Sequence, residues 1–535
     1  MNDGGVSVGE ALVGLLEAYG VTDVFGIPGV HNVEMYRALP RSGITHVLTR
    51  HEQGAGFMAD GYARASGKPG VCFTITGPGL TNIMTPMGQA YSDSVPMLVI
   101  SSTLDVKDWG QGRGRLHEMR SQRNAAATVS QLAATCYTAR DVQDRIAEAF
   151  SLFASARPRP VYLEIPLDVL KQPAGDGWQP RELASKPHAA PGQVADAVAR
   201  LSAAASPVII LGGGARHAGA AAIAIAEKTG AVIFTTIAAK GAVPDDHPLL
   251  AGALLPNPLA TKIIMNADAV LAAGTELSET DLWYQTFAIT SGLIRVDIDP
   301  ASLARPYPAD LPITGDACAT LSAIAAGLPD ENQTAARADE VTTLRARCAD
   351  SQDDLRQTVT TVLDTVRAAL PANTIIASDM TQIAYAANEV LSFARPDCYL
   401  HPAGFGTLGY ALPAAIGARV ACPDRPVVAM AGDYGLQYTV NELGTAAELA
   451  KPLIILLWNN DALGQIRDDM VDKGIQPNAV TLINPDFAAL AKAYKCGAIR
   501  PQTLDELTAA IQAGLAAEAP VVIEVRPAIV KAGRK

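Results

Sequence analysis

The stretch Ala431-Gly-Asp-Tyr-Gly435, read together with the pair Asn459-Asn460, decides the fold. Each follows a short apolar run, over residues 425–431 and 452–458, of the kind that forms a buried parallel strand. The residues between the runs, 439–450, predict a helix. A strand, a crossover helix and a second strand place both strand ends at the same edge of one parallel sheet, where such folds bind ligands.

Asp433 and Asn460 would therefore lie close together, with Asn460 placed 27 positions after Asp433. A carboxylate, a carboxamide and a nearby backbone carbonyl are hard oxygen ligands of the kind that suits Mg²⁺. The alternative is a turn Asp and a turn Asn without a metal. The spacing alone leaves both open, because short motifs match by chance.

Length and composition favour a large α/β protein. A chain of 535 residues is too long for one core, and about two to four domains are expected. Hydrophobic residues make up 49% and aromatic residues 5%, and 45 Gly with 35 Pro punctuate many short elements. The net charge of −12 argues against nucleic acid or an anionic membrane surface as the main partner.

The cysteines indicate a reducing compartment. They are odd in number, widely scattered and without C-x-x-C spacing, so neither a disulfide framework nor a zinc site is predicted. No basic segment leads into an apolar one at the N-terminus, and no apolar 20-mer occurs, so a cytoplasmic protein without a membrane span is expected. The seven are Cys72, Cys136, Cys318, Cys348, Cys398, Cys422 and Cys496.

Alternating strand and helix patterns divide the chain into three α/β units, each predicted to be a doubly wound parallel sheet. The predicted domains are 1–175, 190–330 and 355–535, joined by a Pro-rich linker and a charged connector. The run Gly212-Gly-Gly214 in the middle unit is a weak dinucleotide signal, because no G-x-G-x-x-G follows it.

Several blocks together resemble the acetolactate synthase branch of the thiamine-diphosphate enzymes, over nearly the whole chain and in the family's order. The resemblance implies a pyrimidine-binding, a middle and a diphosphate-binding domain, thiamine diphosphate and Mg²⁺ as cofactors, and a homodimer or homotetramer with active sites at the subunit interface. FAD in the middle domain, as in the synthase, is left open, and the weak glycine signal argues against it. The blocks are Arg50–Ala55, Asp60–Arg64, Gly77–Gly79, Gly404–Gly409, Leu412–Gly417 and Gly432-Asp433 to Asn460.

The resemblance also assigns the cofactor contacts. Asp433, Asn460 and the carbonyl of Ala462 would hold Mg²⁺. The carbonyl of Gly406 would accept a hydrogen bond from the cofactor's amino group, and Leu408 would support its bent shape. Further expected contacts are Pro28, Gly29, Glu52, Gly432, Tyr434, Gly435 and Leu463.

Glu52 is the predicted catalytic residue. In the family the matching Glu bonds the pyrimidine ring and promotes formation of the thiazolium ylid, which requires a partly dry site. A Glu that opens a helix is otherwise often only a favourable dipole contact. The surrounding block favours the catalytic role.

Departures from the synthase concern the substrate pocket. His117 and Glu118 replace a Phe-Gln pair, and Gln465 and Asp469 replace a Met and a Trp, with Asp468 beside them. Carboxylates near the pocket suggest a 2-oxo acid with a cationic far end, since guanidinium offers a forked match to carboxylate. The blocks resemble those of 5-guanidino-2-oxopentanoate decarboxylases. The alternative is that these residues form a solvated helix face or loop.

The predicted reaction is non-oxidative decarboxylation of a 2-oxo acid to an aldehyde and CO₂, with His117 as the candidate proton donor. One alternative is a carboligase like acetolactate synthase, and another is a non-catalytic homologue that binds cofactor. Tyr434 stands where relatives have a small residue. We expect its ring to point into the core with Gly435 supplying flexibility; otherwise the site is altered and binds cofactor weakly.

Overall fold

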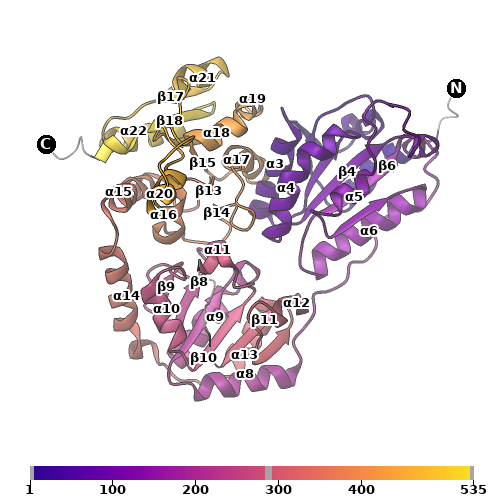
Figure 1. Ribbon diagram of the computed structural model, residues 1–535. Helices are drawn as coiled ribbons and strands as arrows, with labels where there is room; N and C mark the ends of the chain where they lie inside the picture. Colours follow the sequence, from indigo (N-terminus) through magenta and orange to yellow (C-terminus); the bar gives the residue numbers. More distant parts are fainter. Residues whose placement is uncertain (1–4, 284–288, 290–291, 531–535) are drawn as a thin grey trace.

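The computed structural model describes residues 5–283, 289 and 292–530, and three six-stranded sheets organise them. The registered strand pairs within each sheet run parallel. Figure 1 shows helices around each sheet, with the first domain in indigo to purple, the middle domain in magenta and the third in orange to yellow. The predicted fold class of three doubly wound α/β domains is confirmed.

The first sheet has the order β2-β1-β3-β4-β6-β5. The chain leaves β1 for β2 on one side and returns to β3 on the other, so the loops after β1 and β3 flank a crevice at the carboxyl edge. The first helix is α1, Val8–Ala18, and Ser7 and Glu10 form a capping box at its N-terminus. The strands are β1 Asp23–Gly26, β2 Thr45–Leu48, β3 Gly70–Thr74, β4 Met97–Thr103, β5 Leu132–Thr135 and β6 Val161–Pro166, and the main further helices are α2 Val33–Tyr36, α3 Glu52–Ser66, α4 Pro78–Ser92, α5 Gln122–Ala126, α6 Ala139–Ser155 and α7 Leu167–Leu170.

The middle sheet has the order β12-β11-β10-β7-β8-β9. Its glycine run after β7 packs against the loop after β10: Gly212 donates to the carbonyl of Ala273 at 2.9 Å, and Gly214 to that of Gly274 at 3.0 Å. These N–H groups are therefore committed to joining two loops. The strands are β7 Pro207–Leu211, β8 Val232–Thr235, β9 Leu250–Gly252, β10 Ala269–Ala273, β11 Leu293–Asp297 and β12 Leu311–Thr314, and the helices include α8 Pro191–Ala203, α9 Gly219–Thr229, α10 Pro258–Met265, α11 Glu279–Leu282, α12 Pro300–Ala304 and α13 Ala317–Gly327.

The third sheet has the order β14-β13-β15-β16-β18-β17. The charged connector before it contains the helix α14, Ala338–Asp350. The helix predicted over 439–450 is shorter: α18 spans Asp433–Tyr438, a 3-10 turn follows, and α19 spans Leu443–Glu448. The strands are β13 Ile375–Ser378, β14 Tyr399–Leu400, β15 Val427–Gly432, β16 Ile454–Trp458, β17 Gly497–Ile499 and β18 Val521–Val525, and the remaining helices include α15 Asp354–Ala369, α16 Gln382–Val390, α17 Ala411–Ala421, α20 Gly464–Asp472, α21 Phe487–Ala493 and α22 Leu504–Leu515.

Helices α3 and α17 join the first and third domains within the chain, and they lie beside each other in Figure 1. Glycines allow a close crossing. A Cβ on Gly61 would lie 2.0 Å from the carbonyl oxygen of Ala414, and one on Gly417 would lie 1.9 Å from that of Met58. No side chain fits at either position without a backbone shift. Two motif glycines therefore serve this contact between domains.

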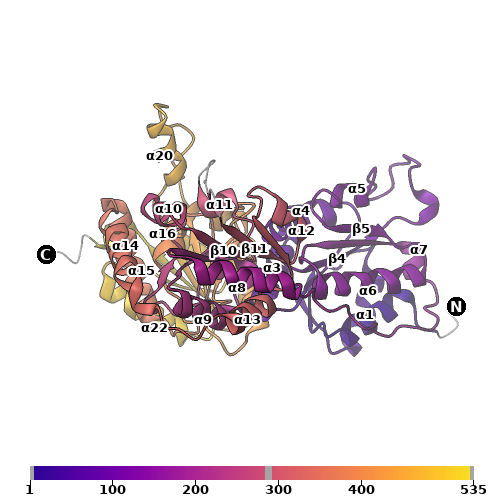
Figure 2. The same ribbon diagram turned by 90° about the horizontal axis from the view of Figure 1, so that it is seen from below.

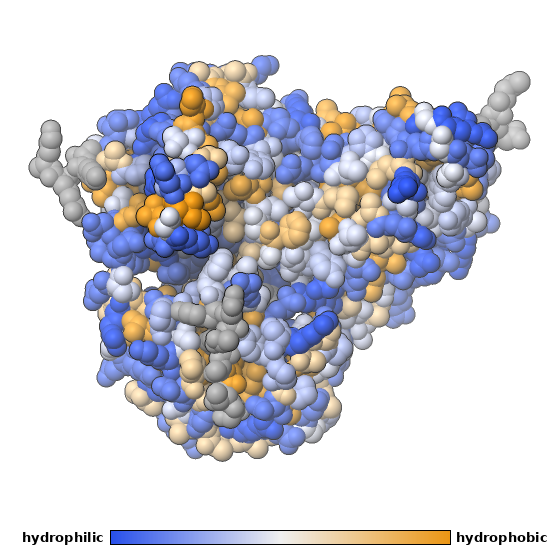
Figure 3. Space-filling view, in the orientation of Figure 1, coloured by the Kyte–Doolittle hydropathy of each residue, from blue (hydrophilic) through white to orange (hydrophobic). Residues whose placement is uncertain are grey.

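The described part of the chain contains no helix that is both long and apolar enough to cross a membrane. Its seven cysteines are unpaired. Figure 3 shows hydrophobic and hydrophilic residues interspersed over one face of the molecule, with one hydrophobic cluster at the position of α20 in Figure 1. The exposed apolar side chains of this helix are Ile466 and Val471.

Candidate active site

The Asp and Asn motifs end neighbouring strands of the third sheet. Strands β15 and β16 pair in parallel, with Gly432 opposite Trp458, so Asp433 and Asn459 leave the sheet side by side. Asp433 begins α18 at the carboxyl edge of β15. The predicted meeting of these two turns at one sheet edge is confirmed.

Oxygen atoms converge at this edge on one amide nitrogen. The Asn484 side-chain N–H₂ donates to Asp433 Oδ2 at 2.8 Å, Asn459 Oδ1 at 3.1 Å and Asp461 Oδ1 at 3.1 Å. Burial raises the pKa of the Asp433 carboxyl, although the bond from Asn484 opposes the shift. Asn484 lies 51 residues after Asp433 and was not predicted.

The side chain of Asn460 has other partners than that of Asn459. Its Oδ1 accepts from the backbone N–H of Ala462 at 3.2 Å, and its Nδ2 donates to Gln382 Oε1 at 3.3 Å. Leu463, which follows Ala462, donates its backbone N–H to the carbonyl of Val480. The structure therefore gathers the oxygens of Asp433, Asn459 and Asp461 around Asn484, while the Asn460 carboxamide contacts Ala462 and Gln382.

Tyr434 corrects one prediction. Its ring is half-buried and stands edge-on to Tyr438, with ring centroids 5.4 Å apart, and Tyr438 is 47% exposed. The expectation that this ring points into the core is wrong, because α18 directs positions 434 and 438 to the same outer face. Gly435 is needed for space: a Cβ there would lie 2.6 Å from Asp379 Oδ2.

Asp379 organises the glycine-rich loop Gly404–Gly409. Its buried carboxylate accepts from the backbone N–H groups of Gly409 and Met380, and burial nevertheless raises its pKa to about 6. Gly406 has φ +66°, a left-handed conformation that suits glycine. Leu408 is half-buried.

Helix α4 of the first domain also holds this loop. Asp93 accepts from the N–H groups of Ala403 at 3.1 Å and Gly404 at 2.7 Å, and Gln89 Oε1 accepts from the Thr407 hydroxyl at 3.3 Å. Arg64 donates to Asp93 at 2.8 Å, which fixes the carboxylate from α3. The conformation of the loop thus depends on both domains.

Glu52 is the first residue of α3 and is buried, with 8% of its surface exposed. The Asn82 amide donates to Glu52 Oε2 at 2.9 Å from α4. Asn82 was not predicted, and no motif marks it. The carboxyl therefore sits in the partly dry position that the predicted role requires.

The loop after β1 carries Pro28 and Gly29. The N–H of Gly29 donates to Asn32 Oδ1 at 2.6 Å, and a Cβ on Gly29 would lie 2.4 Å from Ile75 Cδ1. Pro28 is exposed. This loop thus approaches the end of β3 closely, at the crevice of the first sheet.

His117 and Glu118 lie in the long loop between β4 and α5. His117 has φ +65°, and its carbonyl would lie 2.6 Å from a Cβ on Gly77. The Glu118 carboxylate accepts from the N–H groups of Gly112 and Arg115, each at 3.0 Å, and so supports its own loop. Both residues line a cavity of about 220 Å³, which also reaches the buried Glu164.

Gln465, Asp468 and Asp469 belong to α20, which projects from the body of the molecule in Figure 2. The Gln465 amide donates to Asp469 Oδ1 at 3.0 Å, and Asp468 pairs with Arg467 at 2.9 Å. The charge of Asp469 reaches α16: burial, Asp379 and Asp469 together raise the pKa of Tyr385 to about 12. Within one chain, the predicted substrate carboxylates therefore lie in two domains: Glu118 is in the first domain, and Asp468 and Asp469 are in the third. Each of them bonds to neighbours in its own domain.

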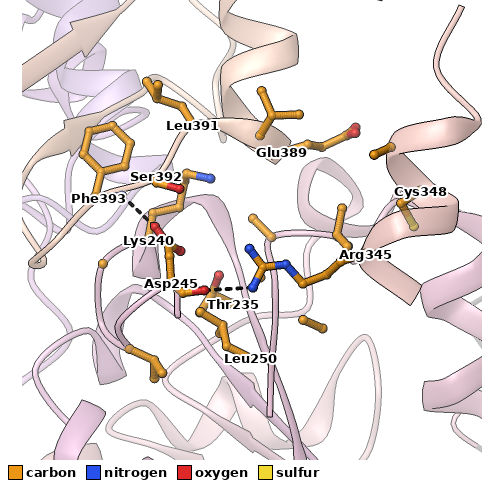
Figure 4. Close-up of a pocket in the computed structure, with 18 of the residues that line it drawn as sticks. Thr235, Lys240, Asp245, Leu250, Arg345, Cys348, Glu389, Leu391, Ser392 and Phe393 are labelled. Carbon is orange, nitrogen blue, oxygen red and sulfur yellow. Dashed lines mark hydrogen bonds between the residues drawn. The ribbon is translucent and has the colours of Figure 1, made fainter. Parts of the chain in front are cut away.

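A second cavity, of about 200 Å³, lies between the middle and third domains and is shown in Figure 4. Its polar groups join the domains: Asp245 accepts from the N–H of Phe393 at 3.1 Å, and Lys240 donates to the carbonyl of Asn388 at 3.0 Å. Arg345 donates to the carbonyl of Asp245 at 2.8 Å. Burial lowers the pKa of Lys240 to about 8. We interpret this cavity as part of a structural joint.

Family models match each of the three domains in order. They are the N-terminal TPP binding domain of thiamine pyrophosphate enzymes over residues 6–126, the central domain over 194–324 and the C-terminal TPP binding domain over 379–525. The chain belongs to the thiamine pyrophosphate enzymes. Thiamine pyrophosphate, their cofactor, is also called thiamine diphosphate.

Individual relatives match almost end to end. The chain is 49% identical over 527 residues to a probable 2-ketoarginine decarboxylase, AruI, of Pseudomonas aeruginosa, covering 98% of this chain and 94% of that protein. It is 33% identical over 546 residues to the acetolactate synthase large subunit of Corynebacterium glutamicum, covering 96% and 86%. It is 32% identical over 469 residues to the acetolactate synthase isozyme 1 large subunit of Escherichia coli, covering 85% and 82%.

Proposed function

We propose that this chain is a thiamine-diphosphate-dependent decarboxylase that converts 5-guanidino-2-oxopentanoate to an aldehyde and CO₂. That acid is 2-ketoarginine, named in the relative that is 49% identical over 98% of the chain, and this match carries the proposal. The carboxylates Glu118, Asp468 and Asp469, at positions where the synthases have uncharged residues, support the choice of a cationic acid.

The residues at the third-sheet edge fit a Mg²⁺ ion and a diphosphate. The Asp433 carboxyl is buried and its pKa is raised, so a neighbouring cation would offset the cost of ionising it. The Asp433 carboxylate, the Asn460 carboxamide oxygen and the Ala462 carbonyl are hard donors of the type that Mg²⁺ binds, and the Asn460 oxygen already lies 3.2 Å from the backbone nitrogen of Ala462. In our proposal Asp433, Asn460 and the carbonyl of Ala462 hold the ion, and the diphosphate contacts Gly432, Tyr434, Gly435 and Leu463.

The rest of the cofactor fits the glycine loop and the first domain. A Cβ on Gly406 would meet only Met380 Cε at 3.5 Å, which leaves its surface open to a ligand. In our proposal the carbonyl of Gly406 and the side chain of Leu408 hold the central part, and Pro28, Gly29 and Glu52 the pyrimidine. When bound, thiamine diphosphate supplies a nucleophilic carbon and an electron sink.

Side chains of the protein orient the reacting groups and transfer protons. Asn82 holds the Glu52 carboxyl in a buried position, from which Glu52 exchanges a proton with the pyrimidine nitrogen. His117 donates a proton from a ring nitrogen to the carbon that has lost CO₂. The Nδ1 atom of His117 is buried and has no hydrogen-bond partner within the described residues, so one ring nitrogen is free for this task.

Recognition of the guanidinium would use Glu118, Asp468 and Asp469, with Gln465 beside them. Glu118 and Asp469 now accept hydrogen bonds from their own loop and helix. A guanidinium offers five N–H donors in a planar fork, so it can replace weaker neutral donors at these carboxylates. Binding therefore exchanges local bonds for bonds to the substrate.

We further propose that the domains are 1–175, 190–330 and 355–535, and that the chain forms a homodimer or homotetramer in the cytoplasm. The exposed apolar residues Ile466 (48%) and Val471 (58%) on the projecting α20 support contact with another subunit. Seven unpaired cysteines support a reducing compartment. The backbone N–H groups of Gly212 and Gly214 are bonded within the middle domain, so these two groups offer no support for FAD.

A substrate panel tests the proposal. The purified protein with Mg²⁺ and thiamine diphosphate is offered 5-guanidino-2-oxopentanoate, pyruvate, phenylpyruvate and 2-oxoisovalerate, and aldehyde and CO₂ are measured. We expect the highest kcat/KM for the guanidino acid, and a preference for an uncharged acid would refute the cationic substrate. Titration of the apo-protein with Mg²⁺ and thiamine diphosphate gives the cofactor affinity at a site containing Tyr434.

Carboligation is the second candidate, because relatives at 33% and 32% identity are acetolactate synthases. Efficient formation of acetolactate from pyruvate would favour it over decarboxylation. A non-catalytic homologue would bind the cofactor and release neither product from any acid. The presence of Glu52 argues against that reading.

A further inference from the structure

Two imidazole rings meet at the crevice of the first sheet. His31 lies in the loop between β1 and α2, and His117 lies in the loop between β4 and α5. Their ring centroids are 5.1 Å apart and the rings stand edge to face, at 69°. Eighty-six positions separate them in the chain, so only the fold brings them together. Sequence patterns had indicated His117 alone.

Both rings keep an unused nitrogen. The Nδ1 atoms of His31 and His117 are buried and have no hydrogen-bond partner among the described residues. A buried polar atom without a partner is unfavourable, and a catalytic role or a bound water or ion is among the reasons that such an atom is kept. Two of them in adjacent rings, beside the loop of Gly29, point to a shared role.

The charges around His31 decide where a proton can reside. Burial and the charge of His117 lower the pKa of His31; Lys171 acts in the same direction, and Asp105 opposes it. These groups come from two segments: Asp105 and His117 lie in the long connection between β4 and α5, and Lys171 follows α7. Two positively charged rings at this separation repel each other. Burial and the neighbouring ring therefore both favour the neutral form of His31.

We propose that His31 is a positioning residue: its ring packs edge to face against His117 and holds the His117 ring in the orientation from which it donates a proton. The inference rests on the proposed decarboxylation, in which the N–H bond of His117 breaks as a C–H bond forms at the carbon that has lost CO₂. Water returns the proton to His117. His31 keeps the ring of His117 oriented throughout.

The first test follows the rings themselves and needs no turnover. The full-length protein has eight histidines, which are labelled with ¹³C at Cε1 and titrated by NMR, with the His31→Phe and His117→Phe proteins assigning the two signals. We expect coupled titration of the two rings, and a changed curve for His117 when His31 is Phe. An unchanged His117 curve in His31→Phe would overturn the pairing, whatever the activity.

The second test is kinetic and uses the holoenzyme. For His31→Phe we expect kcat for 5-guanidino-2-oxopentanoate to fall about tenfold, KM to change less than about threefold, and the acid limb of the kcat profile to move. His31→Gln, which restores a polar group, should recover part of the loss, and it also serves if the Phe protein does not fold. Wild-type kcat and an unmoved acid limb in both variants would refute the proposal.

A matched control is available in His46, another first-domain histidine with a pKa lowered by burial and a ring edge-on to an aromatic neighbour, Tyr36. His46→Gln should keep kcat within about twofold and leave the pH profile in place. If no acid in the panel is decarboxylated by the wild-type protein, the proposed function fails. The NMR titration still decides the pairing in that case.

Discussion

The buried carboxylate of Asp379, at the end of β13, accepts the backbone N–H of Gly409 with its two oxygens at 3.1 and 3.0 Å. This bond ties the strand of one sheet to the end of the glycine-rich loop that contains Gly406. The other end of the loop is held by Asp93 of the first domain. The candidate cofactor loop is therefore clamped from two domains.

Asp379 predicts a pH dependence of stability. Burial raises its folded-state pKa from the ordinary 3.8 to about 6. The favourable contribution of its protonated form is thus present at low pH and is lost as the pH rises from about 4 through 6. The loss amounts to roughly 3 kcal/mol at most, from about 1.4 kcal/mol per pKa unit. Asp379→Asn removes this titration.

The measurement is the apparent melting temperature of both proteins between pH 4.5 and pH 7.5. We expect wild type to lose stability relative to Asp379→Asn across this range. Asp424→Asn, an exposed turn residue before β15, is the control and should follow wild type. A constant difference between wild type and Asp379→Asn at every pH would contradict the shifted pKa.

Glu52→Gln tests the proposed proton exchange. The amide keeps the size of the side chain and its bond with Asn82 but cannot exchange a proton with the cofactor, so kcat should fall at least about a hundredfold. Asn82→Ala removes only the bond that orients Glu52 and should cost about tenfold. Thiamine diphosphate binding, followed by titration of the apo-protein, should persist in both. Full turnover by Glu52→Gln would disprove the catalytic assignment.

The substrate carboxylates predict a selective loss. Asp469→Asn and Glu118→Gln each remove one negative charge, and each should raise KM for 5-guanidino-2-oxopentanoate about tenfold because a charged hydrogen bond to guanidinium is lost. KM for pyruvate should stay within about twofold. Asp472→Asn, at the last residue of α20, is the control. Equal effects on both acids would show that these residues support their loop and helix alone.

The crossing of α3 and α17 predicts a structural effect. Gly417→Ala places a methyl group 1.9 Å from the carbonyl oxygen of Met58 and should destabilise the protein by about 2 kcal/mol through overpacking. Gly14→Ala is the matched control in α1, where nothing lies within 4 Å of the added methyl. It should stabilise by about 0.5–1 kcal/mol, since Ala favours the helix. Thermal unfolding measures both, and equal melting temperatures would contradict the close crossing.

The sequence alone was enough to predict the parallel sheets of this protein and the helices that cover them. Short apolar runs with crossover helices predict parallel sheets, and the parallel pairing of β15 with β16 then forces Asp433 and the Asn pair to one edge. The same reasoning places Glu52 at the start of α3. These predictions depend on periodicity and on local strand ends, which are properties of contiguous residues.

Only the tertiary structure decided which side chains support the site. Asn82, Asn484 and His31 come from loops and helices without a motif, and they meet Glu52, Asp433 and His117 across 30, 51 and 86 positions of chain. Asp379 directly follows β13, and its bond to Gly409 likewise depends on the tertiary fold. Tyr434 was misjudged, because the burial of a ring depends on the rotation of its helix against neighbours that a local pattern does not contain.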